Sequence, residues 1–573
     1  MDIEKRNTKI RFDILAVACI VLFCFAVTPV TFQNDTFYTI RIGELIVNNG
    51  IDMQDHFSWH EGLPYTYPHW AYDVGIYFIY HLGEMSGIAD GGMLFIYIST
   101  VILTCILGLL IYFTASKSSK NPLVSFILTL FAMYLLKDFI AARAQLVTFS
   151  LFVLTILLIE SFLSSKKKRY LVGLVIISIV IANVHVAVWP FFFVLFMPYV
   201  AEYLIALVLE KNLVSKILIL HRKQKVEEVE KKISKEKNEE KLKKLNTKLE
   251  QFKKDLEKQK ETEARVIEKR EERRKEPFRI KVQKIDCAKW LILVMIICAF
   301  TGLLTPLGTT PYTYLIKTMQ GNTTKSISEH LPLVLYDEKD TLTIMIAIFA
   351  MLIFTKVKVN LRDLFMVGGL VLLSFMSRRQ VSLLMIIGIF SFAKWVEYLA
   401  DKYDKDGSYH FMDLMTTNIG KVITIFIIAF ISMAIAKPKA SDNFVNKNRY
   451  PVEASTWILE NLDVKEIKLY NEYNYGSYLL YRGIPVFIDS RADLYAPEFN
   501  KKEDEEEGRD IFSDYMNTSS IATYYENKFD EYGITHVIIM KNAKLNLFLS
   551  RDEDNYKELY KDDNFVVYER NVQ

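Results

Sequence analysis

The chain has 573 residues, of which 51% are hydrophobic and 13% aromatic, and its mean hydropathy is +0.16. A soluble protein of this size carries charge throughout its domains, whereas here the charge is confined to a few blocks between long apolar runs. The net charge of +3 is too small to indicate nucleic-acid binding, and the five cysteines lie in or beside apolar runs, which excludes a disulfide framework.

The apolar runs predict membrane-spanning helices. A helix that crosses roughly 30 Å of hydrocarbon needs about 20 mostly apolar residues. By this measure we expect about eleven transmembrane helices, at 12–30, 92–114, 122–137, 146–164, 170–184, 187–209, 288–305, 341–356, 362–376, 380–397 and 420–437. The first run lacks a cleavage site of small residues, so it predicts a retained membrane helix rather than a signal peptide.

The basic residues predict the orientation of these helices. With the N-terminus in the cytoplasm, the inner loops carry most of the Lys and Arg residues, as the positive-inside rule requires; these loops are 117–120, 166–169, 211–286, 356–362 and 398–419. We therefore expect a multi-pass protein of the plasma membrane whose C-terminal part lies outside the cytoplasm.

Four parts follow from this topology. They are an N-terminal transmembrane module at 1–210, which includes a long first outer loop at 31–91, a charged cytoplasmic insert at 211–286, a second transmembrane module at 287–439 and a soluble outer domain at 440–573. In the insert, a heptad spacing predicts either a solvated helical hairpin or a coiled coil that binds a protein partner; its residues are Leu242, Leu245, Leu249, Phe252 and Leu256.

The outer domain alternates between strand and helix patterns. Strands are predicted at 466–470, 486–488, 536–540 and 565–568, and helices near 454–461, 475–481 and 511–527. This alternation predicts a small α/β domain. The fold class is thus a multi-pass α-helical membrane protein with a helical insert and an extracytoplasmic α/β domain.

Polar residues able to do chemistry gather on the outer side. Asp35 directly follows the first membrane helix, where partial desolvation suits a carboxylate to general-base work. After it, apolar residues between Phe37 and Ile46 predict a helix along the membrane interface. Further candidates on this side are Asp55, His56, His69, Arg143, His185, Glu329, His330, Arg378 and Arg379. Each alone is a common interfacial side chain. Together, these residues are suited to bind an anionic headgroup and to activate a hydroxyl.

Common catalytic signatures are absent from the sequence. It has no P-loop, no G-x-S-x-G and no H-E-x-x-H, so ATP-driven transport and simple hydrolysis gain no support. Histidines near carboxylates leave a divalent metal ion open, but their spacing fits no recognised ligand set, and no cofactor is assigned.

The first outer loop resembles that of the GT-C superfamily of membrane glycosyltransferases. The resemblance lies in Asp35 after the first helix, then in Arg41-Ile-Gly-Glu44, Gly50-Ile-Asp-Met-Gln-Asp-His-Phe-Ser58 and Pro68-His-Trp70. Arg143-Ala-Gln145 and Asn183-Val-His185 resemble later motifs of the same group. Bacterial members related to mannosyltransferases and aminoarabinose transferases are the most similar.

The resemblance implies an inverting-type transfer of sugar from a polyprenyl-phosphate donor to an outer-face acceptor. It implies Asp35 as the base, and Arg143 with Arg378 or Arg379 as phosphate ligands assisted by His185. Many members carry two adjacent acids in this loop, whereas here Asn34 precedes Asp35, and Asp55 is the candidate for the second acid.

In the outer domain, the strand predicted before Asp489-Ser-Arg491 makes these residues candidates for ligand binding, with a structural turn as the alternative. Two other functions stay open for the whole chain. One is a transporter or polysaccharide-export component, although the halves show no internal repeat. The other is a degenerate GT-C scaffold.

Overall fold

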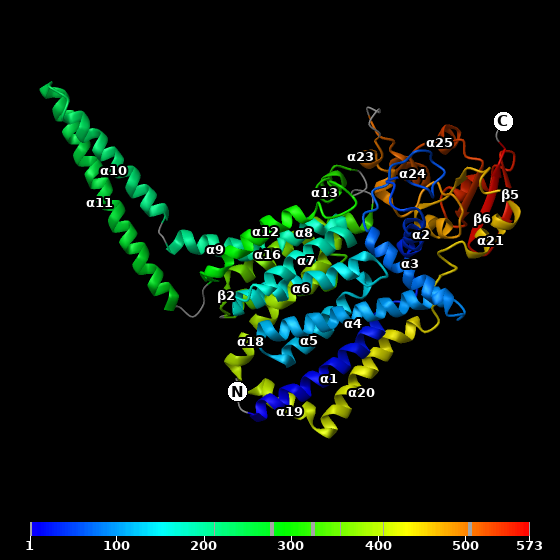
Figure 1. Cartoon of the computed structure of the whole chain (residues 1–573), viewed down its shortest axis with the longest axis horizontal. Helices are drawn as coiled ribbons and strands as arrows, with labels where there is room; N and C mark the ends of the chain where they lie inside the picture. The colour runs from blue at the N-terminus through cyan, green and yellow to red at the C-terminus, as the bar shows by residue number, and fades with distance from the viewer. Residues whose placement is uncertain are drawn as a thin grey trace.

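The computed structural model describes residues 3–210, 213–275, 280–321, 327–355, 357–404, 406–501 and 507–571. A bundle of long helices forms the centre of the molecule (Figure 1). A helical hairpin extends from one end of this bundle, and a domain with a small β-sheet covers the opposite end (Figure 1).

The bundle comprises helices from both halves of the chain. The first half contributes α1 (Ile3–Val27), α4 (Gly91–Ser119), α5 (Pro122–Leu135), α6 (Ala144–Ser165), α7 (Arg169–Val184), α8 (Trp189–Val194) and α9 (Met197–Glu210). The second half contributes α12 (Lys289–Thr301), α13 (Thr310–Gln320), α15 (Lys339–Phe354), α16 (Leu361–Met376), α17 (Val381–Leu383), α18 (Ile389–Tyr403), α19 (Gly407–Thr416) and α20 (Asn418–Ala436).

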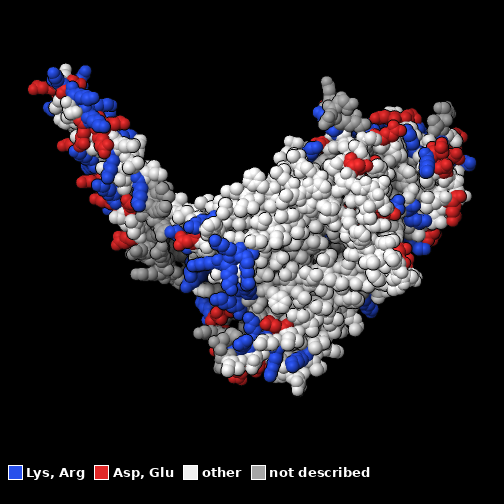
Figure 2. All heavy atoms as spheres, viewed as in Figure 1, with Lys and Arg blue, Asp and Glu red and all other residues white. Residues whose placement is uncertain are grey.

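Six helical segments of the described residues are long and apolar enough to cross a membrane: Ile3–Val27, Gly91–Ser119, Ala144–Ser165, Val186–Leu209, Arg378–Tyr403 and Asn418–Lys439. The other five predicted spans fall on shorter helices, α5, α7, α12, α15 and α16. Figure 2 shows a broad zone nearly free of charge between the two ends of the molecule. The chain is therefore a membrane protein, and the count of eleven spans stays a prediction.

Polar side chains inside the bundle bond to their own helices. The hydroxyls of Thr100, Thr104 and Thr155 donate to backbone carbonyls four residues earlier. Such bonds satisfy hydroxyls where water is absent. Apolar residues such as Phe12 and Ile111 fill the core around them.

The charged insert is an antiparallel pair of helices, α10 (Leu213–Ile233) and α11 (Glu239–Lys275). Val226 and Val229 of α10 are buried, and the heptad residues of α11 are half-buried. Lys253 bridges to Glu230 across the pair at 2.9 Å. Binding of a partner by this hairpin stays a prediction, and residues 276–279 of the insert lie outside the described ranges.

The C-terminal domain contains a four-stranded sheet in the order β3-β4-β6-β5. β3 (Leu469–Tyr470) is parallel to β4 (His536–Met540), whereas β6 (Phe565–Arg570) is antiparallel to β4 and to β5 (Tyr556–Lys561). The helices around the sheet are α21 (Val452–Asn461), α22 (Tyr473–Tyr481), α23 (Pro497–Asn500), α24 (Ile511–Ser520), α25 (Tyr525–Tyr532) and α26 (Asn546–Leu549).

The segment 486–488 is not a strand of this sheet. Instead, Val486 pairs with the first loop, donating to the carbonyl of Phe57 and accepting from Trp59, each at 3.2 Å. The segment is buried because the first loop covers it. Its apolar sequence pattern is therefore the same as that of a buried sheet strand. The strand β5 was not predicted, since only Tyr556 in it is buried.

The first loop forms two helices, α2 (Asn34–Asn49) and α3 (Trp70–Met85). We expected the first of these along the membrane interface, but it is covered by α3 and α22. The ring of Phe37 lies 5.0 Å from that of Tyr450 and 5.1 Å from that of Tyr478. The apolar face of α2 is therefore buried by the C-terminal domain rather than by lipid.

Candidate active site

The end of the bundle beneath the C-terminal domain encloses a cavity of about 680 Å³. Its walls come from α2, the loop before α3, the start of α6, the segment after α7, α13, residues 327–330 and 376–380, and the domain segments 473–474 and 490–494. Eight of the candidates from the sequence line it: Asp35, His69, Arg143, His185, Glu329, His330, Arg379 and Arg491. We call this space the main cavity.

An ion cluster occupies one side of the main cavity. Asp35 lies in the first turn of α2, where the helix N-terminus favours a negative charge. Arg143 precedes α6, forms an ion pair with Asp35, and contacts Glu329 at 3.3 Å. Burial alone would raise the pKa of Glu329, but Arg143 and Arg379 outweigh it and lower the pKa. Asp35 and Glu329 thus share one guanidinium.

A second polar group is built on His69. Its Nδ1 lies 2.8 and 2.9 Å from the two carboxylate oxygens of Asp73, and its Nε2 lies 3.0 Å from the Tyr38 hydroxyl. Asp73 is fully buried, which raises its pKa, and His69 acts against that rise. These contacts fix the ring of His69 at the cavity wall.

The glycine of the Arg-Ile-Gly-Glu motif explains how Asp73 reaches this place. A Cβ on Gly43 would lie 2.1 Å from the backbone oxygen of Asp73. Only glycine therefore permits α2 and α3 to approach so closely, and this approach sets the His69–Asp73 pair beside Tyr38.

The third group contains His185, Arg379 and His330. Arg379 donates to Gln145 at 3.3 Å, and His185 contacts the Thr148 hydroxyl at 3.2 Å. Burial, and next the charge of Arg379, lower the pKa of His330 to about 4, so that this histidine is neutral near pH 7. Arg379 therefore adds a second guanidinium to the cavity beside Arg143.

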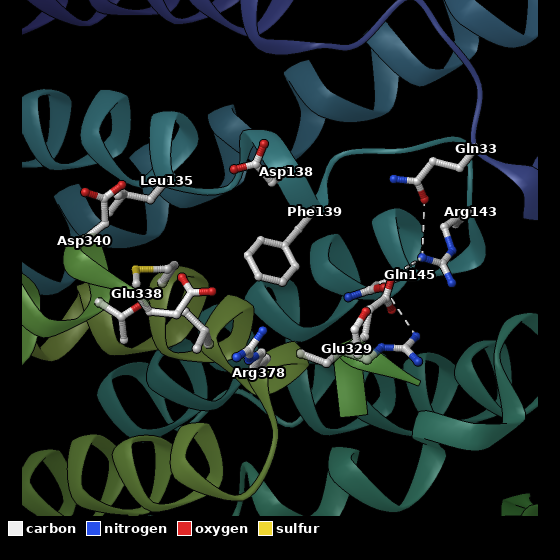
Figure 3. Close-up of a pocket in the computed structure, with 15 residues that line it drawn as sticks. Gln33, Leu135, Asp138, Phe139, Arg143, Gln145, Glu329, Glu338, Asp340 and Arg378 are labelled. Carbon is white, nitrogen blue, oxygen red and sulfur yellow. Dashed lines mark hydrogen bonds and ion pairs between the residues drawn. The ribbon is translucent and has the colours of Figure 1, made fainter. Parts of the chain in front are cut away.

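A smaller cavity of about 250 Å³ adjoins the first and shares Arg143, Gln145, Glu329 and Arg379 with it. Figure 3 shows Phe139 between Asp138 and Arg378 in this smaller space, with Glu338 and Asp340 beyond. Arg378 contacts Asp337 at 3.5 Å and does not line the main cavity. Of the two candidate arginines, Arg379 thus lies nearer to Asp35.

Two candidates from the first loop, His56 and Asp55, line neither cavity. His56 is exposed, lies outside both cavities and bonds to Asp52 at 2.6 Å. Asp55 also lies outside the cavities, because its carboxylate is buried against Arg491 at 2.6 Å and accepts from the Ser58 hydroxyl at 2.5 Å. It therefore does not face Asp35 as a second acid.

Asp489 and Arg491 form a buried pair. Arg491 donates to the two oxygens of Asp489 at 2.9 and 2.6 Å, and Tyr495 donates to Asp489 at 2.6 Å. Arg491 also lines the main cavity. This network joins the C-terminal domain to the first loop through Asp55.

Several cavity residues were not among the candidates from the sequence, namely Tyr38, Tyr65, Gln145, Tyr314, Tyr473 and Asp493. The aromatic cluster of the first loop that includes Tyr65 fits a membrane-surface belt and a sugar-stacking surface equally well, and Asp493 follows Arg491 by only two residues. In the described ranges, no three His, Cys, Asp or Glu side chains are grouped to hold a metal ion, so the metal left open by the sequence has no residue assigned.

Neither a protein-family model nor a curated protein matches the sequence. Solved structures, in contrast, are similar to the structure of this chain. The archaeal oligosaccharyltransferase AglB from Archaeoglobus fulgidus, in complex with an inhibitory peptide and a dolichol-phosphate, has a TM-score of 0.51 at 12% identity. The apo form of the Archaeoglobus fulgidus oligosaccharyltransferase gives 0.51 at 13%.

Each alignment covers 98% of this chain and 74% of the other. AglB belongs to the GT-C superfamily. At this level of identity the similarity defines architecture, and it extends over almost the whole chain. The chain therefore has the GT-C fold.

Proposed function

We propose that this protein is a membrane glycosyltransferase that moves a sugar from a polyprenyl-phosphate carrier to an acceptor hydroxyl on the extracytoplasmic face. The observation that carries the proposal is the cavity in which Asp35, Arg143 and Arg379 meet at the end of an apolar helix bundle. A structural neighbour was solved with a dolichol-phosphate, which is a lipid phosphate of the same class.

The arginines suit the phosphate of the donor. A phosphate binds guanidinium groups through charge-assisted hydrogen bonds, and Arg143 and Arg379 line one cavity. In the described structure Asp35 forms an ion pair with Arg143. A donor phosphate would compete with Asp35 for this guanidinium, and the carboxylate would then be available to a second substrate.

Asp35 then acts as the general base. Its carboxylate takes the proton of the acceptor hydroxyl, the acceptor oxygen bonds to the anomeric carbon, and the bond from that carbon to the phosphate oxygen breaks. The phosphate leaves with the bonding electrons, held by Arg143 and Arg379. Attack from the face opposite the leaving group inverts the anomeric configuration.

The test measures transfer from labelled polyprenyl-phosphate sugars in membranes that contain wild type, Asp35→Asn or Asp52→Asn at matched levels. Loss of a general base lowers the rate by about 10²–10⁴-fold, which is the expectation for Asp35→Asn. Asp52→Asn is the matched control, because Asp52 lies in the same loop but outside the cavity. Equal transfer by Asp35→Asn and wild type would remove Asp35 as the base.

A GT-C scaffold without activity is the second candidate, because Arg143 already neutralises Asp35 in the described structure. Two further measurements on the same membranes, of donor-lipid binding and of its movement across the membrane, separate the scaffold and the transporter from the enzyme. Binding of donor lipid without transfer, across several sugars, favours the scaffold. Movement of lipid-linked sugar across the membrane without transfer favours the transporter.

A further inference from the structure

A buried phenol on the wall of the main cavity has no hydrogen-bond partner. Tyr65 is 4% exposed, and its hydroxyl bonds to none of the residues that the structure describes. The hydroxyl of nearby Tyr67, by contrast, donates to Asp52 and to the backbone of Gln54. Because a buried polar group without a partner is unfavourable, the Tyr65 hydroxyl is a place where a bound molecule gains a hydrogen bond.

A carboxylate of the C-terminal domain lines the same cavity. Asp493 lies in a 3₁₀ turn, η8 (Ala492–Tyr495), and one of its oxygens accepts a hydrogen bond from Tyr314 of α13. Within the described ranges this is the one hydrogen bond that the carboxylate accepts. Burial raises the pKa of Tyr314, and the nearby Asp493 and Tyr65 add to that rise. Tyr314 contacts Asp493 directly, and both line the same cavity as Tyr65.

The ion network beneath these groups holds them in place. Arg491 is bound by Asp489 and Asp55, and its guanidinium lies 5.0 Å from the ring centre of Tyr65. The turn that carries Asp493 begins directly after this arginine. Tyr65 and Asp493 come from different parts of the chain, yet both depend on Arg491 for their position, which makes the pair preorganised.

A free phenol and a half-bonded carboxylate match the hydroxyl groups of a carbohydrate, each of which donates one hydrogen bond and accepts others. We infer that Tyr65, Tyr314 and Asp493 form the subsite that binds the sugar of the lipid-linked donor. Asp493 accepts from one sugar hydroxyl, and Tyr65 bonds to a second. This inference rests on the proposed function and adds to it the residues that recognise the sugar.

Charged side chains of both signs lie near this subsite. Burial raises the pKa of Asp493, while Tyr314, Arg379 and His69 act against that rise, so both basic side chains are within electrostatic reach. On the other side, the guanidinium of Arg491 lies over Tyr65.

The experiment measures binding to the purified full chain in detergent. The probes are polyprenyl phosphate without sugar and polyprenyl-phosphate mannose, glucose and galactose. We expect Tyr65→Phe and Asp493→Asn to weaken the best-bound sugar lipid about tenfold, the size of one lost hydrogen bond. Binding of sugar-free polyprenyl phosphate should stay within about twofold. Tyr475→Phe is the control, because its hydroxyl bonds to Ile538 inside the domain, away from the cavity.

Equal weakening of sugar-bearing and sugar-free lipid would overturn the sugar subsite and leave the proposed function standing. Unchanged binding of all sugar lipids by both variants would do the same. Should one variant fail to fold, the other decides by the same comparison. If the wild type binds neither kind of lipid, the proposed function falls, and the inference falls with it.

Discussion

At the scale of single residues, the main cavity holds charges that nearly balance. Its lining includes Arg143, Arg379 and Arg491 together with the carboxyl groups of Asp35, Glu329 and Asp493. Charges at the edge of a membrane are costly unless opposite charges accompany them. The balance therefore permits arginines to lie beside apolar helix ends, and a bound phosphate would replace a carboxylate as the partner of an arginine.

The buried pair of Asp55 and Arg491 is expected to matter more for stability than for chemistry. Both side chains are at most 2% exposed, and removal of one partner of such a pair costs about 3–5 kcal/mol. Asp55→Asn should therefore lower the thermal unfolding midpoint of the purified protein clearly. Asp52→Asn removes an exposed pair with His56 and should cost less than about 1 kcal/mol. Equal midpoints for the two variants would contradict a structural role for Asp55.

The same pair predicts a dependence of stability on pH. Burial alone would raise the pKa of Asp55, but Arg491 and Ser58 lower it below the ordinary value of 3.8. A carboxyl whose pKa is lower in the folded state stabilises that state above its ordinary pKa, and the contribution is lost as the pH falls further. We expect the unfolding midpoint of the wild type to fall more steeply than that of Asp55→Asn below about pH 4. Parallel profiles of the two proteins would show that Asp55 is not the group responsible.

Some cavity residues could be predicted from the sequence, because each end of a membrane helix lies on a definite side of the membrane. Asp35 and Arg143 border apolar runs, so counting the runs puts both on the same face, and the structure brings them into contact. The sequence does not reveal which loop residue meets which domain residue. Tyr65 and Asp493 line the same cavity only once the C-terminal domain packs on the first loop. Nothing in the local sequence pattern distinguishes Asp493 from Asp489.

At the scale of helices, the crossing of α2 and α3 depends on a single glycine. A methyl group on Gly43 would overlap the backbone of Asp73, and overpacking of this kind costs about 1–3 kcal/mol. Gly43→Ala should lower the unfolding midpoint and reduce sugar transfer, because His69 moves with Asp73. Gly75→Ala in α3 is the matched control, since a Cβ there meets no atom within 4 Å. Normal transfer by Gly43→Ala would show that the helix spacing does not set the site.

The elements of the chain were predictable to different degrees. Long apolar runs produced helices, because the hydrophobic pattern of a membrane span is strong. Short segments were not predictable in the same way. Val486 is buried by the first loop rather than by a neighbouring strand, and β5 lies at the sheet edge with a mostly polar surface. Burial by a distant segment has the same local pattern as burial in a sheet.

At the scale of the whole molecule, the orientation in the membrane is testable. The proposal requires the C-terminal domain outside the cytoplasm and the hairpin inside. Lys544→Cys and Lys231→Cys place a thiol at an exposed position of each part. In intact cells, a membrane-impermeant maleimide should label the first variant and not the second, with wild type as the background. The reverse labelling would invert the topology and place the cavity on the cytoplasmic face.

Asp55 and Arg491, whose side chains meet beneath the cavity, are 436 positions apart in the chain. At about 5–20 residues per second, a ribosome needs about 20–90 s to make the second residue after the first. During that time the part of α2 that the C-terminal domain covers has no partner, and Asp55 is bonded to Ser58 but not to Arg491. The site is thus completed late in synthesis, and a nascent chain cut short before Arg491 lacks the part of the cavity wall formed by 491–494.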